Sequence, residues 1–390
     1  MKAPRASGKH PVNGQPMIFP DSDRATEHSD YLSRQLITYI GNKRSLLGHL
    51  DKAVSRVKER LGKTRLRVFD AFAGSGVVSR LLKHHADLLV SNDLENFAAV
   101  AGRCFLRNRS SVNLDDLRNV VEDLNERVEC TGFAPGFIEE LYAPRDENNI
   151  TVHDRVFYTR GNARRLDNYR RLLNGVDLAY RDLLLGPLLS EASVHANTSG
   201  VFKGFYKDRA TGIGKFGGSK SDALSRIKGR IDLDVPVLSR FECDVEVYQQ
   251  DANELAGKLR DLDLAYLDPP YNQHPYGSNY FMLNLLVDYK NPQRVSTVSG
   301  IPTDWQRSDY NVRSRCLRRL ADLIGAVDAP FILVSFNDEG FIAPTEMREM
   351  LAQIGKLEVI EIPYNTFRGS RNLQGRSIHV TEQLFLIERH

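Results

Sequence analysis

The residues with the clearest chemical meaning are Asp268, Pro269, Pro270 and Tyr271, which directly follow the apolar run 264–267. A regular strand does not continue through two prolines, because proline lacks the N–H group that a sheet requires. The four residues are therefore expected at the end of a buried strand. In an open α/β sheet, ligands bind outside the carboxyl ends of the strands. The pattern predicts a carboxylate, a rigid carbonyl and an aromatic ring at the mouth of a binding site.

These groups match what is needed to methylate an exocyclic amine of a nucleic-acid base. The amino group of adenine is conjugated with its ring and is a poor nucleophile. The Asp268 carboxylate and the Pro269 carbonyl could accept its two hydrogens and free the nitrogen lone pair, while Tyr271 stacks on the base. Attack on a sulfonium methyl group then needs mainly in-line positioning. A paired base would first have to be flipped out of the duplex.

A second chemical feature is the Gly-rich turn that follows the apolar stretch 66–69 and contains Asp70, Phe72, Gly74 and Gly76. Strand, Gly-rich turn and helix together open many nucleotide-binding α/β folds. This turn lacks both the third glycine of a dinucleotide site and the Gly-Lys-Ser/Thr of a P-loop. Asp70 would repel a pyrophosphate and attract a cationic sulfonium or ammonium group. The turn therefore favours a nucleoside ligand with a positive group.

Two further predicted strands, 88–93 and 245–251, also end in acids. Asp93 stands where a carboxylate that binds ribose hydroxyls is expected. Lys43 follows a Gly-Asn turn at a helix start, and two interpretations remain open: a solvated surface residue, or a residue that meets a ligand's carboxylate. The acids of these strands, including Asp251, should line one edge of the sheet.

Strands alternate with helices along the chain, which predicts an α/β fold with a doubly wound, largely parallel, Rossmann-like sheet. Two more strands are expected at 331–337 and 382–387, and helices at 313–326 and 345–354. Residues 1–30 have the composition of a disordered tail. We predict a catalytic domain from residues 31–100 and 245–390, with residues 101–244 as an inserted DNA-recognition region.

Basic and aromatic residues alternate within this insert, which suits phosphate contacts and base stacking, although a solvated helix face explains some of the arginines. The irregular, Lys- and Gly-rich stretch 203–218 fits the nucleic-acid interpretation best. The aromatic residues of the pattern are Phe157, Tyr158, Phe202, Phe205, Tyr206 and Phe216.

Composition sets limits on these interpretations. The net charge of the 390 residues is only +3, so a nucleic-acid surface must be a local patch. The sequence has no apolar run near the ~20 residues of a membrane span and no signal peptide at its start, which predicts a soluble, cytoplasmic protein. The scattered cysteines, which form no CxxC pair and indicate neither a metal site nor disulfides, are Cys104, Cys130, Cys243 and Cys316.

The motifs Tyr39-Ile-Gly-Asn-Lys43, Asp70-x-Phe-Ala-Gly-Ser-Gly76, Asn92-Asp93 and Asp268-Pro-Pro-Tyr271 stand in this order in the chain. Together they resemble the D12 class, alpha group, of adenine-specific DNA methyltransferases. The resemblance covers residue 32 to the end of the chain. It implies S-adenosylmethionine as cofactor, double-stranded DNA as substrate, base flipping, and restriction-modification with a cognate restriction endonuclease as a candidate partner.

By this resemblance, the target base would be handled by Asp268, Pro269, Pro270 and Tyr271. The implied cofactor-binding residues, with Asp251 near the adenine of the cofactor, are Tyr39, Lys43, Asp70, Phe72, Gly74, Gly76, Asp93 and Asp251. His274 and Tyr276 could contact DNA or belong to a surface loop, and Trp305 and Tyr310 are interpreted as packing residues.

Two other classes of function remain open from the residues themselves. The same chemistry could methylate cytosine N4, RNA or a protein amide, and the preference for adenine comes only from the resemblance. The chain could also be a non-catalytic nucleic-acid-binding module. The intact Asp268 and Gly74-Ser-Gly76 argue against the latter.

Overall fold

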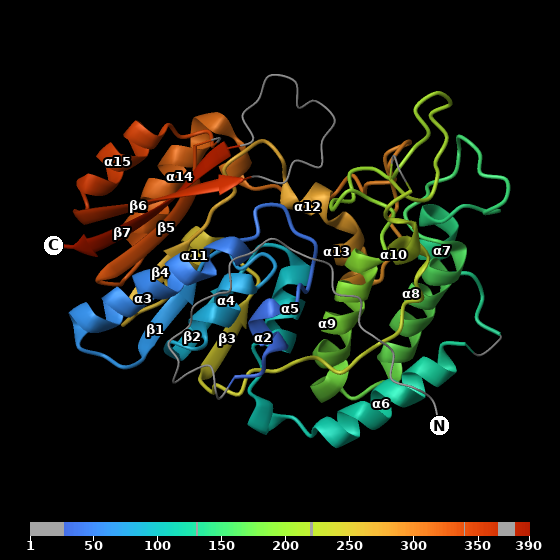
Figure 1. Ribbon diagram of the computed structural model, residues 1–390, viewed down its shortest axis with the longest axis horizontal. Coiled ribbons are helices and arrows are strands. Elements are labelled where there is room, and N and C mark those ends of the chain that lie inside the picture. Colours follow the sequence, from blue (N-terminus) through green and yellow to red (C-terminus); the bar gives the residue numbers. More distant parts are fainter. Residues whose placement is uncertain (1–26, 130–131, 219–220, 339, 366–378) are drawn as a thin grey trace.

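The computed structural model describes residues 27–129, 132–218, 221–338, 340–365 and 379–390, and a seven-stranded sheet lies at its centre (Figure 1). The strand order is β3-β2-β1-β4-β5-β7-β6. Neighbouring strands pair in parallel from β3 to β5, and β7 runs antiparallel to both β5 and β6. The strands are β1 (Leu66–Asp70), β2 (Ala86–Asn92), β3 (Asp244–Tyr248), β4 (Leu264–Leu267), β5 (Phe331–Asn337), β6 (Gly355–Asn365) and β7 (His379–Arg389).

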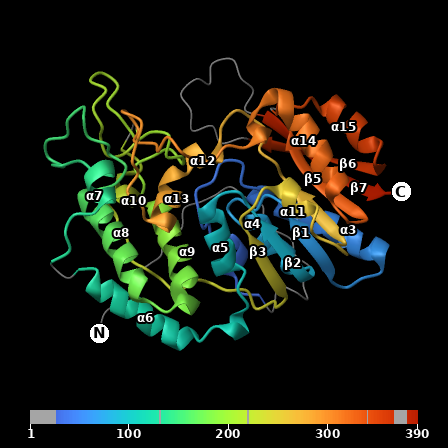
Figure 2. The same cartoon turned by 180° about the vertical axis from the view of Figure 1, so that it is seen from behind.

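Helices cover both faces of this sheet, because alternate residues of its apolar strands point to opposite sides. One face packs on α3 and α4, which lie in front of the strands in Figure 1. The opposite face packs on α11, α14 and α15 and is turned toward the viewer in Figure 2. The helices around the sheet are α2 (Asp30–Ser33), η1 (Arg44–Leu46), α3 (Leu47–Leu61), α4 (Val77–Leu82), α5 (Asn96–Phe105), α11 (Ala252–Ala256), η4 (Asp309–Asn311), α14 (Arg313–Ala326) and α15 (Pro344–Ala352).

A second group of helices forms its own core beside the sheet, in the right half of Figure 1. It contains the helices of the predicted insert together with α12 and α13, which come directly after the catalytic motif. Helix α5 joins the two groups by packing against α9. The helices of this group are η2 (Arg109–Ser111), α6 (Leu114–Arg127), α7 (Phe137–Tyr142), α8 (Arg160–Leu172), η3 (Leu173–Gly175), α9 (Leu178–Val194), α10 (Leu224–Lys228), α12 (Tyr276–Asn279) and α13 (Phe281–Asp288).

The structure confirms the predicted α/β fold class and most predicted elements of the sheet domain. The expected bounds of α14 and β5 are those observed. Strand β6 was not predicted, and it forms an antiparallel pair with β7 at the edge of the sheet. The predicted domain boundaries stay predictions, and the boundary at residue 101 falls inside α5.

Several expectations from composition concern residues that the structure describes only in part. Of the predicted tail, residues 1–26 lie outside the described residues, as does Cys130. The other three cysteines are buried and free. Glu27 contacts the folded chain, where its carboxylate accepts a hydrogen bond from the backbone N–H of Arg240. Among the described helices, none is long and apolar enough to cross a membrane.

Candidate active site

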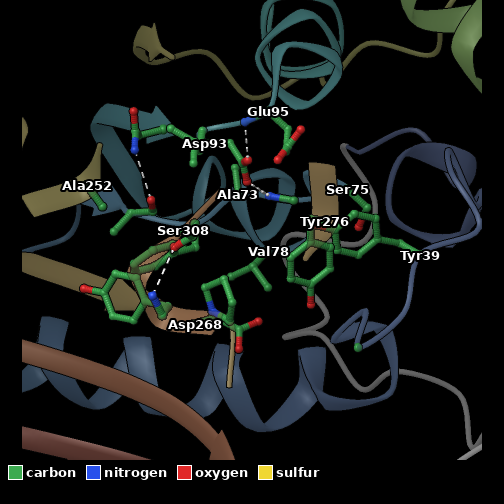
Figure 3. Close-up of a pocket in the computed structure, with 18 of the residues that line it drawn as sticks. Tyr39, Ala73, Ser75, Val78, Asp93, Glu95, Ala252, Asp268, Tyr276 and Ser308 are labelled. Atoms are coloured by element: carbon green, nitrogen blue, oxygen red, sulfur yellow. Dashed lines mark hydrogen bonds between the residues drawn. The ribbon is translucent and has the colours of Figure 1, made fainter. Parts of the chain in front are cut away.

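A cavity opens at the carboxyl ends of β1, β2 and β4 (Figure 3). The cavity joins the Gly-rich turn to the Asp-Pro-Pro-Tyr motif, although nearly two hundred residues separate them in the chain. The predicted site residues that line it are Tyr39, Lys43, Phe72, Gly74, Asp93, Asp251, Asp268 and Pro270. Those that do not line it are Asp70, Gly76, Pro269 and Tyr271.

The Gly-rich turn needs glycine for two reasons, conformation and space. Gly74 and Gly76 have φ values of +53° and +74°, in the left-handed region that other residues rarely adopt. A Cβ atom on Gly74 would lie only 2.9 Å from Cε1 of Tyr39. The Tyr39 ring itself is held by stacking on Tyr276 and Tyr280, at centroid distances of 5.1 and 4.7 Å. Gly74 therefore keeps the floor of the cavity close to an aromatic wall.

Asp93 holds the Gly-rich turn in place. Its Oδ2 accepts a hydrogen bond of 2.7 Å from the Gly74 N–H, and its Oδ1 accepts one of 2.9 Å from the Glu95 N–H. Burial raises the pKa of the Asp93 carboxyl, and these backbone hydrogen bonds partly offset the rise. Each carboxylate oxygen can accept a second hydrogen bond, so the group can also bind hydroxyls in the cavity.

Asp70 lies beneath the cavity, on the side of the sheet that faces α4. Its Oδ2 accepts a 2.5 Å hydrogen bond from Ser79 Oγ. Its buried Oδ1 has no hydrogen-bond partner among the described residues. Burial, opposed by the Ser79 hydrogen bond and reinforced by the nearby Asp268 charge, raises the pKa of Asp70 to about 7. A positive group above the turn would lower the cost of ionising this carboxyl.

Asp251 forms the far side of the cavity and is fixed by two kinds of contact. It caps α11 by accepting hydrogen bonds from the N–H groups of Asn253 and Glu254. Nη2 of Arg319, on α14, lies 3.0 and 2.8 Å from its two carboxylate oxygens. Tyr310 donates a hydrogen bond to Asn253. Tyr310, interpreted from the sequence as a packing residue, is buried and also lines the cavity.

Replacement of Arg319 by methionine should weaken nucleoside binding in this cavity by about fivefold, the scale of a partly exposed ion pair. Methionine keeps the apolar stem of the side chain but leaves Asp251 without its ion pair. Arg318→Met on the same helix is the matched control, because the Arg318 side chain is 89% exposed. Calorimetry with S-adenosylhomocysteine, the demethylated form of the cofactor that the resemblance implies, would measure the affinity of both variants. Equal affinities of the two variants would show that Arg319 does not position Asp251.

The catalytic-motif end of the cavity contains a buried ion-pair cluster. Lys43 Nζ lies 3.1 Å from Asp268 Oδ1 and 3.8 Å from Oε2 of Glu382, a residue of β7. Burial raises the pKa of Asp268 to about 6, with Lys43 lowering it and Glu382 raising it. Burial alone would lower the pKa of Lys43, but Asp268 and the other neighbours outweigh burial and raise it. The prediction that Lys43 meets a ligand's carboxylate is not tested by this arrangement.

Tyr271 packs behind Asp268. Its ring makes an edge contact with Phe336 on β5 at a centroid distance of 5.7 Å, and Lys43 Nζ lies 5.5 Å from its centroid. A Cβ atom on Gly41 would lie 3.1 Å from the Tyr271 hydroxyl, so the Gly-Asn turn closes over this ring. The expected stacking of Tyr271 on a base stays a prediction.

Sequence reasoning missed several residues of the cavity wall. Glu95 is buried, accepts a hydrogen bond from Asn284, and has its pKa raised by burial to about 7. Its position two residues after Asp93, at the same strand end, was an available signal. Tyr276 stacks on Tyr39, whereas Gln306 and Ser308 come from a loop without any recognisable motif.

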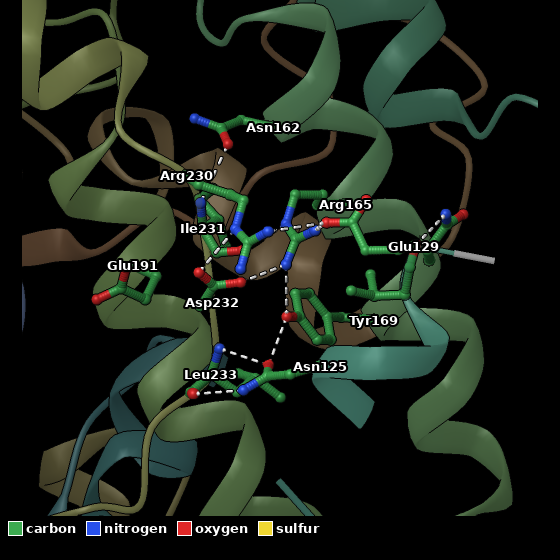
Figure 4. A network of polar contacts seen from close by, with 12 residues as sticks. Asn125, Glu129, Asn162, Arg165, Tyr169, Glu191, Arg230, Ile231, Asp232 and Leu233 are labelled. Atoms are coloured by element: carbon green, nitrogen blue, oxygen red, sulfur yellow. Dashed lines mark hydrogen bonds and ion pairs between the residues drawn. The ribbon is translucent and has the colours of Figure 1, made fainter. Parts of the chain in front are cut away.

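Part of the predicted DNA-contact pattern in the insert proves to be structural. Phe157, Tyr158 and Phe202 are at most 2% exposed and belong to the insert core, so they cannot stack on bases. Arg165 is buried and pairs with Glu129 and Asp232 (Figure 4). Its side chain stabilises the insert and does not offer a free charge for DNA.

Several other arginines of the pattern likewise bind backbone carbonyl groups. Arg155, Arg170 and Arg226 donate hydrogen bonds to such groups. The stretch 203–218 is irregular, as predicted, and holds one isolated bridge, between Lys207 and Gly214. This stretch keeps exposed basic side chains.

Comparisons with known proteins agree with the motifs. The family model described as D12 class N6 adenine-specific DNA methyltransferase matches residues 39–350. The type II methyltransferase M.CviAII of Paramecium bursaria Chlorella virus 1 is 28% identical, over 90% of this chain and 98% of the relative. M.NlaIII of Neisseria lactamica is also 28% identical, over 90% of this chain and 100% of the relative. M.FokI of Planomicrobium okeanokoites is 24% identical, and the match covers 52% of its length.

Proposed function

The chain belongs to the D12 class N6 adenine-specific DNA methyltransferases, and we propose that it takes the methyl group from S-adenosylmethionine and transfers it to adenine beside Asp268. The observation that carries the proposal is the continuity of one cavity. The Gly-rich turn and Asp268 line the same space, so a donor held by the turn would lie next to an acceptor held by the Asp-Pro-Pro-Tyr motif.

The residues of the cavity fit this cofactor. Gly74 lets the turn lie directly against the Tyr39 ring at the cavity wall, and the carboxylate of Asp93 can accept hydrogen bonds from ribose hydroxyls. Asp251 would lie near the adenine ring of the cofactor. The unpartnered Asp70 oxygen beneath the turn favours a cation above it. When bound, S-adenosylmethionine supplies an electrophilic methyl group on a cationic sulfur.

In the proposed reaction, Asp268 and the Pro269 carbonyl accept the two hydrogens of the adenine amino group. The amino nitrogen forms a bond to the methyl carbon as the carbon–sulfur bond breaks toward sulfur, and the amine then loses one proton to water. Asp268 has to be ionised to stabilise the positive charge that develops on the nitrogen. With its pKa near 6, most of the carboxyl is ionised at neutral pH.

Methylation of duplex DNA would require that the target adenine leave the helix, because its amino group is paired inside the duplex. We therefore include base flipping in the proposal, with Tyr271 stacking on the flipped base. The insert, and especially the exposed basic stretch 203–218, would hold the DNA. We also propose that the protein is cytoplasmic and that it protects DNA from a cognate restriction endonuclease. Both parts of the proposal rest on the type II relatives.

Purified protein should transfer labelled methyl groups from S-adenosylmethionine to unmethylated duplex DNA of diverse sequence. Digestion to nucleosides should recover the label in N6-methyladenine. RNA and protein mixtures are the controls for the other substrates that the residues alone left open. Label in N4-methylcytosine, or in RNA or protein but not DNA, would overturn the proposed substrate. No transfer to any acceptor would favour a non-catalytic binding module.

A further inference from the structure

Glu382 lies behind Lys43 at the edge of the active site and belongs to no motif that the sequence revealed. It is on β7, and its register partner Asn337 ends β5, next to the catalytic strand β4. Its Oε2 is 3.8 Å from Lys43 Nζ, and Asp268 forms an ion pair with the same nitrogen atom. The Lys43, Asp268 and Glu382 side chains are 3%, 17% and 6% exposed. One buried carboxylate and one largely buried carboxylate therefore share one buried ammonium group.

We propose that Glu382 is a positioning residue for methyl transfer, which draws part of the Lys43 charge away from Asp268 so that Asp268 remains a strong acceptor for the target amine. This inference rests on the proposed function. It adds to that function a residue that contacts neither the base nor the cofactor and acts by its charge, through Lys43 and directly on Asp268.

The physical argument concerns charge in a site that excludes most water. Positive charge develops on the amine nitrogen during attack, and Asp268 stabilises it. A lysine 3.1 Å from Asp268 would cancel much of that effect if it were paired with Asp268 alone. Glu382 restores the negative potential because it pairs with the same ammonium. The side-chain oxygen atoms of Asp268 and Glu382 that face Lys43 have no hydrogen-bond partner among the described residues, so ion pairing is their main interaction.

Other ionisable groups also face Asp268 and contribute to its titration. Asp70 at the end of β1 adds negative potential, and Tyr266, Tyr271 and Tyr276 are close enough to interact with it. Removal of the Glu382 charge leaves these groups in place. Since Glu382 raises the pKa of Asp268, its removal should lower that pKa. The acid limb of the activity profile should therefore move to lower pH.

The test is the single-turnover rate of methyl transfer to duplex DNA, measured from acid to alkaline pH for the wild type and Glu382→Gln. At neutral pH we expect the rate of Glu382→Gln to be about tenfold lower than that of the wild type. The midpoint of its acid limb should move to lower pH by roughly half to one pH unit, the scale of the effect of one nearby charge. Affinity for S-adenosylhomocysteine should change less than about twofold, because Glu382 does not line the cavity. Glu388→Gln is the matched control, since Glu388 is on the same strand and pairs with Arg60 far from the site. Its profile should equal that of the wild type.

A slower rate with an unmoved acid limb would show a merely structural role and overturn the inference, as would a wild-type rate. If Glu382→Gln does not fold, Glu382→Asp serves instead. This variant keeps the charge, so its rate and its acid limb should stay close to those of the wild type, and a moved limb or a strongly lowered rate would contradict the inference. In a Lys43→Met background, Glu382→Gln should slow methyl transfer less than it does when Lys43 is present, whereas the same fold of slowing in both backgrounds would contradict action through Lys43. Among the outcomes of this experiment, only the absence of methyl transfer by the wild type would refute the proposed function itself.

Discussion

Replacement of Asp268 by alanine should lower the single-turnover rate of methyl transfer by about a thousandfold or more, the scale of losing a principal charged group in a shielded site. The variant loses the carboxylate that accepts a hydrogen from the amine and stabilises its developing positive charge. Lys43 would then pair with Glu382 alone, so the cluster would lose its net negative charge beside the target nitrogen. Both changes act against the transition state.

Cofactor binding should survive this substitution, because the Gly-rich turn, Asp93 and Asp251 are held by contacts that do not involve Asp268. Calorimetry with S-adenosylhomocysteine would separate binding from catalysis. Asp322→Ala is the control, since Asp322 is a half-exposed carboxylate on α14 that pairs only loosely with Arg318, at 3.9 Å. Turnover near the wild-type rate in Asp268→Ala would remove Asp268 from the mechanism.

Replacement of Gly74 by alanine should weaken S-adenosylhomocysteine binding by about tenfold or more. A non-glycine residue in the left-handed region costs roughly 1–2 kcal/mol. The new methyl group would also meet the Tyr39 ring at 2.9 Å, which forces either the turn or the ring to move. Because Asp93 accepts a hydrogen bond from the Gly74 N–H, movement of the turn would disturb that carboxylate too.

Gly48→Ala is the matched control for this prediction. Gly48 is in the first turn of α3, and a Cβ atom there meets nothing within 4 Å. Alanine should stabilise the protein by about 0.4–1 kcal/mol and leave binding unchanged. Thermal denaturation and calorimetry on both variants would check the pair. Wild-type affinity in Gly74→Ala would show that the turn does not contact the cofactor.

The sheet and the two ends of the cavity could be predicted because local patterns specify them. Strand β1 and its Gly-rich turn, and β4 with the two prolines after it, are defined by residues that allow few other structures. Since the carboxyl ends of neighbouring parallel strands meet at one edge, the joining of Asp93, Asp251 and Asp268 in one cavity follows from the fold class.

The direction of individual side chains was harder to predict. The ligand contact expected of Asp70 stays a prediction, and its side chain shares the α4 side of β1 with Val68 and binds Ser79 beneath the cavity. Because side chains alternate between the two faces along a strand, the sequence of β1 could have indicated that Asp70 points to the same side as Val68. Glu382 could not be found in this way, because its place beside Lys43 depends on β7 inserting antiparallel between β5 and β6.

The insert shows the limit of composition as evidence. An arginine-rich sequence suggests a nucleic-acid surface, but a guanidinium group also satisfies carbonyl groups at the ends of helices and pairs with internal carboxylates. Arg165 and Arg170 do this and are only 6% exposed. Their burial depends on contacts with segments distant in the sequence, such as that of Arg170 with α13, which periodicity alone cannot indicate.

The position of S-adenosylhomocysteine in a crystal structure of the protein would test the central claim most directly. The account predicts its adenine beside Asp251, its ribose hydroxyls on Asp93 and its sulfur directed along the cavity toward Asp268. A molecule bound outside this cavity, or one whose sulfur points away from Asp268, would contradict the assignment of donor and acceptor sites to this single space.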